Sequence, residues 1–128
     1  MSRPTGTTLA AELARLADEH PVLGIELEAG DPDAIPPQLQ ALAQSVLVES
    51  IRNAQKHADP RRVGIRVGRE DGAFVLVVVN DGVRGGGGAS GMGLRLAALE
   101  ALQQGGVVEF GRSGPDAWQV RLVVPYGA

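Results

Sequence analysis

The sequence predicts an α+β fold, a two-layer sandwich in which a mixed sheet of about five strands carries about three helices on one face. Helical and extended periodicities follow one another in the order helix, strand, helix, two strands, helix, two strands. The chain has 128 residues, the size of one ordinary domain, so we expect a single domain over residues 1–128. Hydrophobic residues make up 44% of the chain but aromatic residues only 3%, so the core must be aliphatic.

The first two predicted elements are a helix over residues 7–19 and a strand over residues 22–28. Thr7 or Thr8 can cap the start of the helix, and Pro21 stops it. Leucines recur along the helix at spacings of four and three residues, at Leu9, Leu13 and Leu16. The strand alternates apolar and other residues, with Leu23, Ile25 and Leu27 in the apolar positions.

A long helix and two strands form the predicted centre of the fold. The helix runs over residues 37–56, because proline suits a first helical turn and the segment 58–60 contains a proline that ends it. Residues 62–67 alternate as a half-buried strand does. Asp71-Gly72 is a hairpin turn signal, and the apolar run 73–79 is short enough for a central strand.

The last predicted elements are a helix over residues 91–104 and strands over residues 107–110 and 118–124. Gly105-Gly106 breaks the helix, and a Ser-Gly-Pro-Asp turn joins the strands. Large apolar side chains recur at helical spacing, so we expect them to point into the core: Met92, Leu96, Leu99 and Leu102.

One stripe of the central helix changes from apolar to polar. Leu42, Val46, Glu49, Asn53 and Lys56 follow one another at spacings of four, three, four and three, so they share one face. Polar groups that continue a core stripe are costly without a partner, which favours a polar ligand at that end. The amide oxygen suits Mg²⁺, the ammonium group neutralises phosphate oxygens, and the carboxylate orients an incoming group or a water. The alternative is a solvated helix end.

Polar residues also follow the apolar strand, at Asn80-Asp81-Gly82. Side chains that emerge at a strand end lie at the rim of the sheet, where a carboxylate or amide oxygen can accept a hydrogen bond from the exocyclic amine of a base. The same three residues are also a common turn, so this motif alone is weak.

Glycines then gather at Gly85–Gly88 and Gly91–Leu94. Glycines at the start of a helix let backbone N–H groups meet phosphates, and we expect residues 83–90 to form a lid. A plain linker is the alternative. A dinucleotide fingerprint fits poorly because Leu96 stands at its third glycine position, and a P-loop is excluded because no Gly-Lys-Ser/Thr follows.

In this order the three motifs resemble those of the ATP-binding domain of sensor histidine kinases, in the GHKL ATPase superfamily. Residues 49–57 are similar to its N box, 80–82 to its first glycine box and 91–94 to its second, and the resemblance extends from Leu9 to Pro125. The branch with nitrate sensors and the membrane-fluidity thermosensor is the most similar. The resemblance implies the Bergerat-type ATPase fold, with ATP and Mg²⁺ as ligands.

The resemblance also assigns roles to residues. Asn53 binds Mg²⁺, Glu49 and Lys56 are catalytic, and Gly91 and Gly93 lie beneath the phosphates. The full set that it implies at the nucleotide is Asn53, Lys56, His57, Asn80, Asp81, Gly82, Gly91, Met92, Gly93 and Leu94.

The sequence departs from the family at the base. Asn80 stands where an aspartate usually reads adenine; its amide oxygen can still accept the amine, and Asp81 could share the role. Ala117-Trp118 replaces a Gly-Thr pair, so a threonine hydroxyl near the adenine is missing, and Trp118 either lines the base or belongs to the core.

Bulk properties narrow the context. The net charge of −3 gives no electrostatic case for nucleic acid or an anionic membrane, and no cysteine is present. No apolar stretch reaches the length of a membrane span, and no signal peptide is visible, so we expect a cytoplasmic protein. His20 and His57 do not resemble a phosphoacceptor on an exposed helix.

We therefore expect the catalytic part of a longer kinase. It would phosphorylate a histidine on a separate dimerisation domain and signal to a response regulator. The alternatives are an anti-sigma-factor-like serine kinase of the same superfamily and a degenerate nucleotide-binding module.

Overall fold

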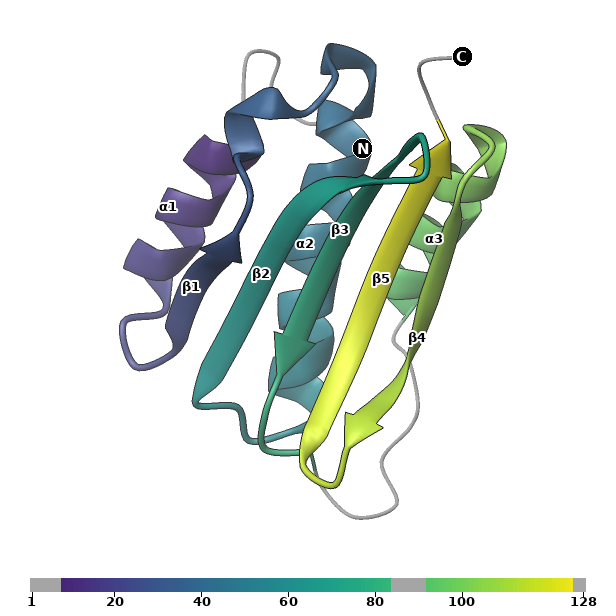
Figure 1. Cartoon of the computed structure of the whole chain (residues 1–128). Coiled ribbons are helices and arrows are strands. Elements are labelled where there is room, and N and C mark those ends of the chain that lie inside the picture. Colours follow the sequence, from purple (N-terminus) through teal and green to yellow (C-terminus); the bar gives the residue numbers. More distant parts are fainter. Residues whose placement is uncertain (1–7, 84–91, 126–128) are drawn as a thin grey trace.

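The computed structural model describes residues 8–83 and 92–125 and shows one sheet with three helices (Figure 1). Two short 3₁₀ turns, Pro32–Ala34 and Pro37–Leu39, precede the second helix. The helices are α1 (Leu9–Glu19), α2 (Gln40–His57) and α3 (Met92–Gln103). The strands are β1 (Gly24–Ala29), β2 (Arg62–Glu70), β3 (Ala73–Asn80), β4 (Val107–Gly114) and β5 (Ala117–Pro125).

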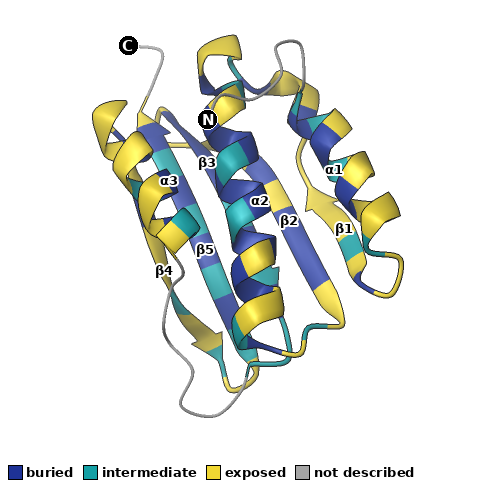
Figure 2. Cartoon of the chain, turned by 180° about the vertical axis from the view of Figure 1, so that it is seen from behind, coloured by how far each residue is buried: buried dark blue, intermediate teal, exposed yellow. Residues whose placement is uncertain are grey.

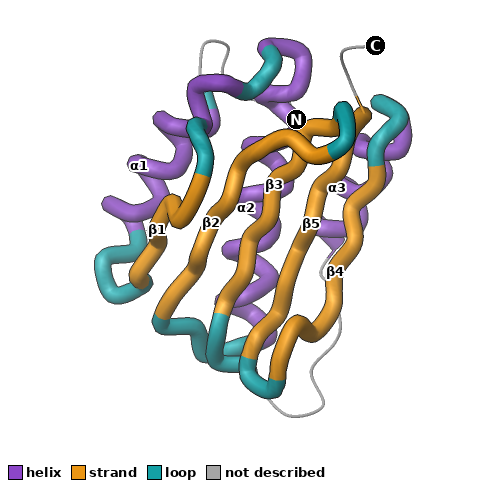
Figure 3. Tube along the Cα trace, in the orientation of Figure 1, coloured by secondary structure: helices purple, strands orange, loops and turns teal. Residues whose placement is uncertain are grey.

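The sheet is mixed and has five strands in the order β1-β2-β3-β5-β4. Only β1 and β2 run parallel, and the other neighbours are antiparallel. All three helices lie on one face of the sheet, and within residues 8–83 and 92–125 the opposite face carries none (Figure 3). The predicted α+β sandwich is therefore confirmed, including its strand and helix numbers.

Burial follows the two layers. In β3 and β5 the residues that face the helices, such as Leu76 and Leu122, are fully buried, whereas Val77 and Val123 on the open face are half-buried. Figure 2 views the molecule from the helix side, and buried residues recur along α2 and, between exposed ones, along α1. The core is aliphatic, as the composition requires, with Phe74 and Trp118 as its aromatic members.

Local sequence signals account for several boundaries. Thr8 caps α1 by accepting a hydrogen bond at Oγ1 from the Ala11 amide, at 3.1 Å. Asp71 and Gly72 have φ angles of 49° and 77°, as the predicted two-residue hairpin needs. At the edge of the sheet, β1 is more exposed than its alternation suggested, and Leu27 is 36% accessible.

The prediction for α3 is wrong in one respect. Its large apolar residues face solvent, because Met92, Leu96, Leu99 and Leu102 are 71%, 56%, 55% and 60% exposed. The buried residues are Leu94, Ala97 and Ala101. Small side chains let two backbones approach closely, so the face with alanines packs inward and the bulky face is left outside.

None of the helices in the described part of the chain combines the length and the apolar character that a membrane crossing requires.

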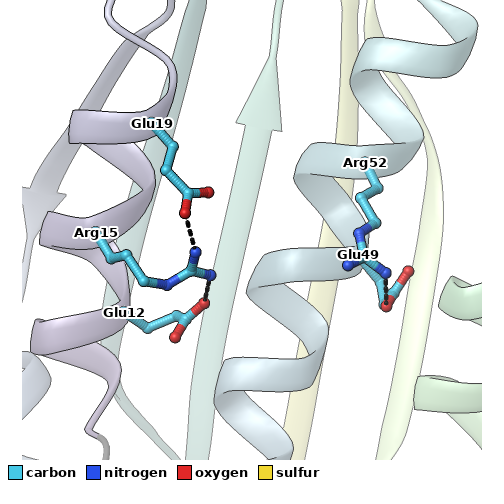
Figure 4. Close-up of polar contacts among 5 residues, drawn as sticks. All are labelled: Glu12, Arg15, Glu19, Glu49 and Arg52. Atoms are coloured by element: carbon cyan, nitrogen blue, oxygen red, sulfur yellow. Dashed lines mark hydrogen bonds and ion pairs between the residues drawn. The ribbon is translucent and has the colours of Figure 1, made fainter.

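Charged side chains form ion pairs along α1, and one of them, Glu12, is buried. On α1, Arg15 lies between Glu12 and Glu19 and pairs with both (Figure 4). The hydrogen bonds that the Arg15 guanidinium donates to the Glu12 and Glu19 carboxylates raise its pKa above the ordinary value.

Candidate functional site

The predicted stripe on α2 is present and changes character where the sequence indicates. Leu42 and Val46 are 1% and 0% exposed and belong to the core. Asn53, further along the same face, is still only 6% exposed, and Lys56 in the last turn is exposed. A buried amide that continues a core stripe is the feature that first indicated a ligand site, and it is retained in the fold.

Glu49 lies between two neighbours at this site. Its Oε2 accepts a hydrogen bond from Nη1 of Arg52 at 3.1 Å, one turn along α2 (Figure 4). Its carboxylate also lies against Gly93, where an added Cβ would be 1.9 Å from Oε1. The side chain of Glu49 is 21% exposed and that of Arg52 71%, so this ion pair is a weak one at the surface.

Gly93 therefore brings the start of α3 to the polar part of α2. A glycine leaves room for the Glu49 carboxylate where it lies, and a side chain at this position would have to displace it. Leu94, the next residue, is 1% exposed and anchors α3 in the core, whereas Met92 is exposed. Gly91 and residues 84–90 of the predicted lid lie outside the described residues.

The end of α2 is fastened to the end of β3. Ala58 forms an isolated antiparallel bridge with Val83, and the Asp59 amide donates to the Gly82 carbonyl at 2.9 Å. Gly82 has a φ of 74°, and an added Cβ would be 2.1 Å from the Asp59 carbonyl oxygen. Glycine is thus required here for two reasons, and it joins two of the predicted motifs.

Asn80 and Asp81 have different environments. Asn80 is 4% exposed, and its Nδ2 donates to the Asp81 carbonyl at 2.9 Å. Asp81 Oδ1 accepts hydrogen bonds from the backbone amides of Arg61 and Arg62 at 2.7 and 3.0 Å. Asp81 thus holds the beginning of β2 against the end of β3.

These contacts also set the charge state of Asp81. Burial raises the pKa of its carboxyl, but the hydrogen bonds from the Arg61 and Arg62 amides outweigh burial, so the pKa lies below its ordinary value. The carboxylate is therefore ionised at neutral pH.

The remaining predicted site residues lie at the end of α2. Lys56 is exposed and His57 half-buried, both in the last turn, where cations interact favourably with the helix dipole. In the part of the chain that the structure describes, Lys56 forms no ion pair.

The donor set fits Mg²⁺ held mainly by a phosphate ligand. Among residues 8–83 and 92–125, no group of three or more His, Cys, Asp or Glu side chains is placed to hold a metal ion. Mg²⁺ in nucleotide sites usually takes one or two protein oxygens and completes its shell with phosphates and water. The buried amide of Asn53 and the carboxylate of Glu49, one turn apart on one face, supply oxygens of this kind.

Two features of the site escaped the sequence prediction. The docking of Asp59 onto Gly82 joins distant segments, and only the helix-stopping Pro60 marked that region in sequence. The pairing of Arg52 with Glu49 has the i, i+3 spacing of helix ion pairs and was open to detection.

Comparison with solved structures identifies the fold. The chain superimposes on the Acinetobacter baumannii histidine kinase AdeS with a TM-score of 0.69 and 14% identity, over 94% of this chain and 66% of that chain. The ATP-binding domain of PrrB from Mycobacterium tuberculosis gives a TM-score of 0.67 and 20% identity, over 91% and 90%. The chain has the fold of a histidine kinase ATP-binding domain.

A third structure has the same fold. The histidine kinase domain from the Erythrobacter litoralis EL346 blue-light activated histidine kinase matches with a TM-score of 0.68 and 19% identity, over 92% of this chain and 65% of that one. The chain thus spans about two thirds of the AdeS and EL346 structures. No family model matches the sequence, and neither does any curated protein. The resemblance seen in the motifs is confirmed at the level of the fold.

Proposed function

We propose that this chain is the Mg²⁺- and ATP-binding catalytic domain of a sensor histidine kinase, which transfers the γ-phosphoryl group of ATP to a histidine on a dimerisation domain. The observation that carries the proposal is the contact between Glu49 on α2 and Gly93 at the start of α3, beside the buried Asn53. A carboxylate, an amide and the first backbone N–H groups of α3, a kind of group that has no partner within its own helix, meet there on the fold of histidine kinase ATP-binding domains.

Each residue has a role that its position supports. In this proposal the backbone N–H groups of the first turn of α3 bind the phosphates, as helix N-termini commonly do, and Gly93 adds no side chain there. Lys56 neutralises phosphate oxygens through its exposed ammonium group. Asn53 would hold Mg²⁺ through its amide oxygen, and the ion would supply charge neutralisation on the phosphates.

In the proposed transfer, an imidazole nitrogen of the acceptor histidine forms a bond to the γ-phosphorus while the bond to the bridging oxygen of ADP breaks. Glu49 accepts a hydrogen bond from the other ring nitrogen and so orients the imidazole in line with the leaving group. The protein contributes positioning and charge neutralisation, because little covalent chemistry is left for it to perform.

The outer face of α3 is the proposed docking surface for the domain that carries the histidine. Met92, Leu96 and Leu99 are all more than half exposed, and exposed apolar stripes of this kind mark interaction sites. The stripe begins next to Gly93, which lies against the Glu49 carboxylate, so a domain docked on it would lie close to Glu49. The AdeS and EL346 chains extend beyond the part matched here, which leaves room for such a domain in a protein of this type.

Calorimetric titration of ATP with and without Mg²⁺ tests the proposal. We expect Mg²⁺-dependent binding by the wild type, and its loss in Asn53→Ala with the fold intact by circular dichroism. Gln55→Ala is the matched control, because Gln55 is an exposed amide two residues further on the same helix. Unchanged ATP affinity in Asn53→Ala would show that the metal assignment is wrong, and a wild type that binds no ATP would overturn the proposed function.

A further inference from the structure

The indole of Trp118 carries a buried hydrogen-bond donor that has no partner among the described residues. Trp118 is 9% exposed, and within the described residues its Nε1 is one of two buried side-chain polar atoms that lack a partner. Buried N–H groups are nearly always hydrogen-bonded, so an orphaned one calls for a ligand, a water or a functional reason.

The position of Trp118 connects it to the candidate base-reading residue. Asn80 and Trp118 are directly paired across the antiparallel strands β3 and β5, and both are buried on the face that the helices cover. Directly opposed residues on one face of a sheet have Cβ atoms about 5 Å apart. The indole donor and the Asn80 amide therefore belong to one small region at the end of these strands.

Asn80 presents the complementary group. Its Nδ2 is used in the hydrogen bond to the Asp81 carbonyl, at 2.9 Å, which leaves Oδ1 to accept. The region thus offers a donor from Trp118 beside an acceptor from Asn80, both fixed by buried backbone and packing.

We propose that Trp118 determines nucleobase specificity: its Nε1–H donates to N1 of adenine while Asn80 Oδ1 accepts from the exocyclic amine at C6. This inference rests on the proposed ATP-binding function and names the group that selects the base. Adenine presents a donor at C6 beside an acceptor at N1. Guanine presents the reverse, an acceptor at C6 and a donor at N1, so both contacts would be mismatched and left unpaired.

A purely structural role explains less. The Trp118 ring stacks on Phe110 with centroids 6.3 Å apart and an angle of 29°, and this packing accounts for its burial. Packing does not account for an unpaired N–H, which a phenylalanine at the same position would avoid. Phe110 is itself 38% exposed, so the ring pair lies at the rim of the core, where a base can approach.

The test uses Mg²⁺ complexes of ATP, 1-deaza-ATP and 7-deaza-ATP as probes, with dissociation constants from calorimetry. Trp118→Phe removes the donor and keeps an aromatic ring. We expect it to weaken binding of ATP and of 7-deaza-ATP about five- to tenfold, the size of one net hydrogen bond, and to leave 1-deaza-ATP binding unchanged. Phe110→Leu, which alters the stack but not the donor, is the matched control and should affect all three ligands equally.

A second readout needs no variant. The chain has one tryptophan, so the indole N–H gives a single resonance in the nuclear magnetic resonance spectrum of the labelled protein. It should move downfield with ATP and 7-deaza-ATP but not with 1-deaza-ATP. The inference is overturned if the wild type binds ATP but the indole resonance does not distinguish the two deaza analogues, or if Trp118→Phe weakens all three ligands alike. A wild type that binds none of them contradicts the proposed function itself.

Discussion

The two helices that meet at the candidate site, α2 and α3, bury themselves in opposite ways. On α2 the large apolar residues, such as Leu47, are fully buried, and the buried Asn53 and the exposed Lys56 follow toward the end of the helix. On α3 the small residues Ala97 and Ala101 are buried with Leu94, whereas the other leucines are exposed, namely Leu96, Leu99 and Leu102. Helix α2 is therefore held by large side chains packed in the core, and α3 mainly by small side chains that let its backbone approach its neighbours closely.

This difference in packing gives the two helices different roles, α2 in stability and α3 in contacts with a partner. Because α2 supplies much of the core, its polar end continues a helix that is held firmly by packing. Because α3 gives little bulk to the core, its large side chains remain available to a partner. Gly93 lies where the two arrangements meet, against the Glu49 carboxylate.

The largest contrast should appear in leucine-to-alanine variants of the two helices. Leu47→Ala empties a fully buried site and should lower the free energy of unfolding by about 2–5 kcal/mol. Leu99 is 55% exposed, so Leu99→Ala should change the free energy of unfolding by less than about 0.5 kcal/mol. Urea denaturation measures both.

The same Leu99→Ala variant should bind ATP normally but transfer phosphoryl to the histidine-bearing domain more slowly. Equal destabilisation by the two leucine variants would refute the contrast between the helices. Normal transfer by Leu99→Ala would remove the docking role of α3.

A second comparison tests how the end of α2 is held. Gly82→Ala places a Cβ 2.1 Å from the Asp59 carbonyl oxygen at a φ of 74°, so we expect a loss of about 2–3 kcal/mol. Gly72→Ala is the matched control, because its φ is 77° but its Cβ would meet nothing within 4 Å. It should cost about 1 kcal/mol. Thermal or urea unfolding of the pair decides, and similar losses would mean that the Asp59 contact is unimportant.

Gly93→Ala should affect function more than stability. The added Cβ displaces only the end of the flexible Glu49 side chain, so the free energy of unfolding should change by less than about 1 kcal/mol. Phosphoryl transfer should fall about tenfold or more, because a displacement near 1 Å at a reacting group is enough. Gly111→Ala, which meets nothing within 4 Å, should be silent in the transfer assay. A Gly93→Ala protein with full activity would argue against the site.

The smallest effect concerns Asp81 and is confined to acid. Its pKa is lower in the folded chain than its ordinary value of 3.8, so the stability it contributes is complete above 3.8 and is lost as the pH falls through the folded pKa. Asp81→Asn lacks this titration. The difference in unfolding free energy between wild type and Asp81→Asn should be constant from pH 5 to 7 and shrink below pH 4. A difference that grows on acidification would contradict the assigned pKa direction.

Sequence patterns predicted the fold well where the largest apolar side chains occupy the face that the periodicity assigns to the core. The stripe of α2, the Asp71-Gly72 hairpin and the order of the elements follow from local rules. The orientation of α3 does not follow from these rules. The large apolar residues of this helix predict its inner face, whereas in the structure alanines lie inside and, with a glycine, allow a closer approach. The bonds of Asp81 to the Arg61 and Arg62 amides and the orphaned donor of Trp118 depend on tertiary contacts that no local spacing encodes.

A titration of the isotopically labelled chain with Mg·ATP, followed residue by residue through its amide resonances, tests the proposed site most directly. We expect saturable shifts at Asn53 and Gly93, where the end of α2 meets the start of α3. Shifts confined to the open face of the sheet, around Arg66, Val77 and Gln119, with Asn53 and Gly93 unmoved, would contradict it.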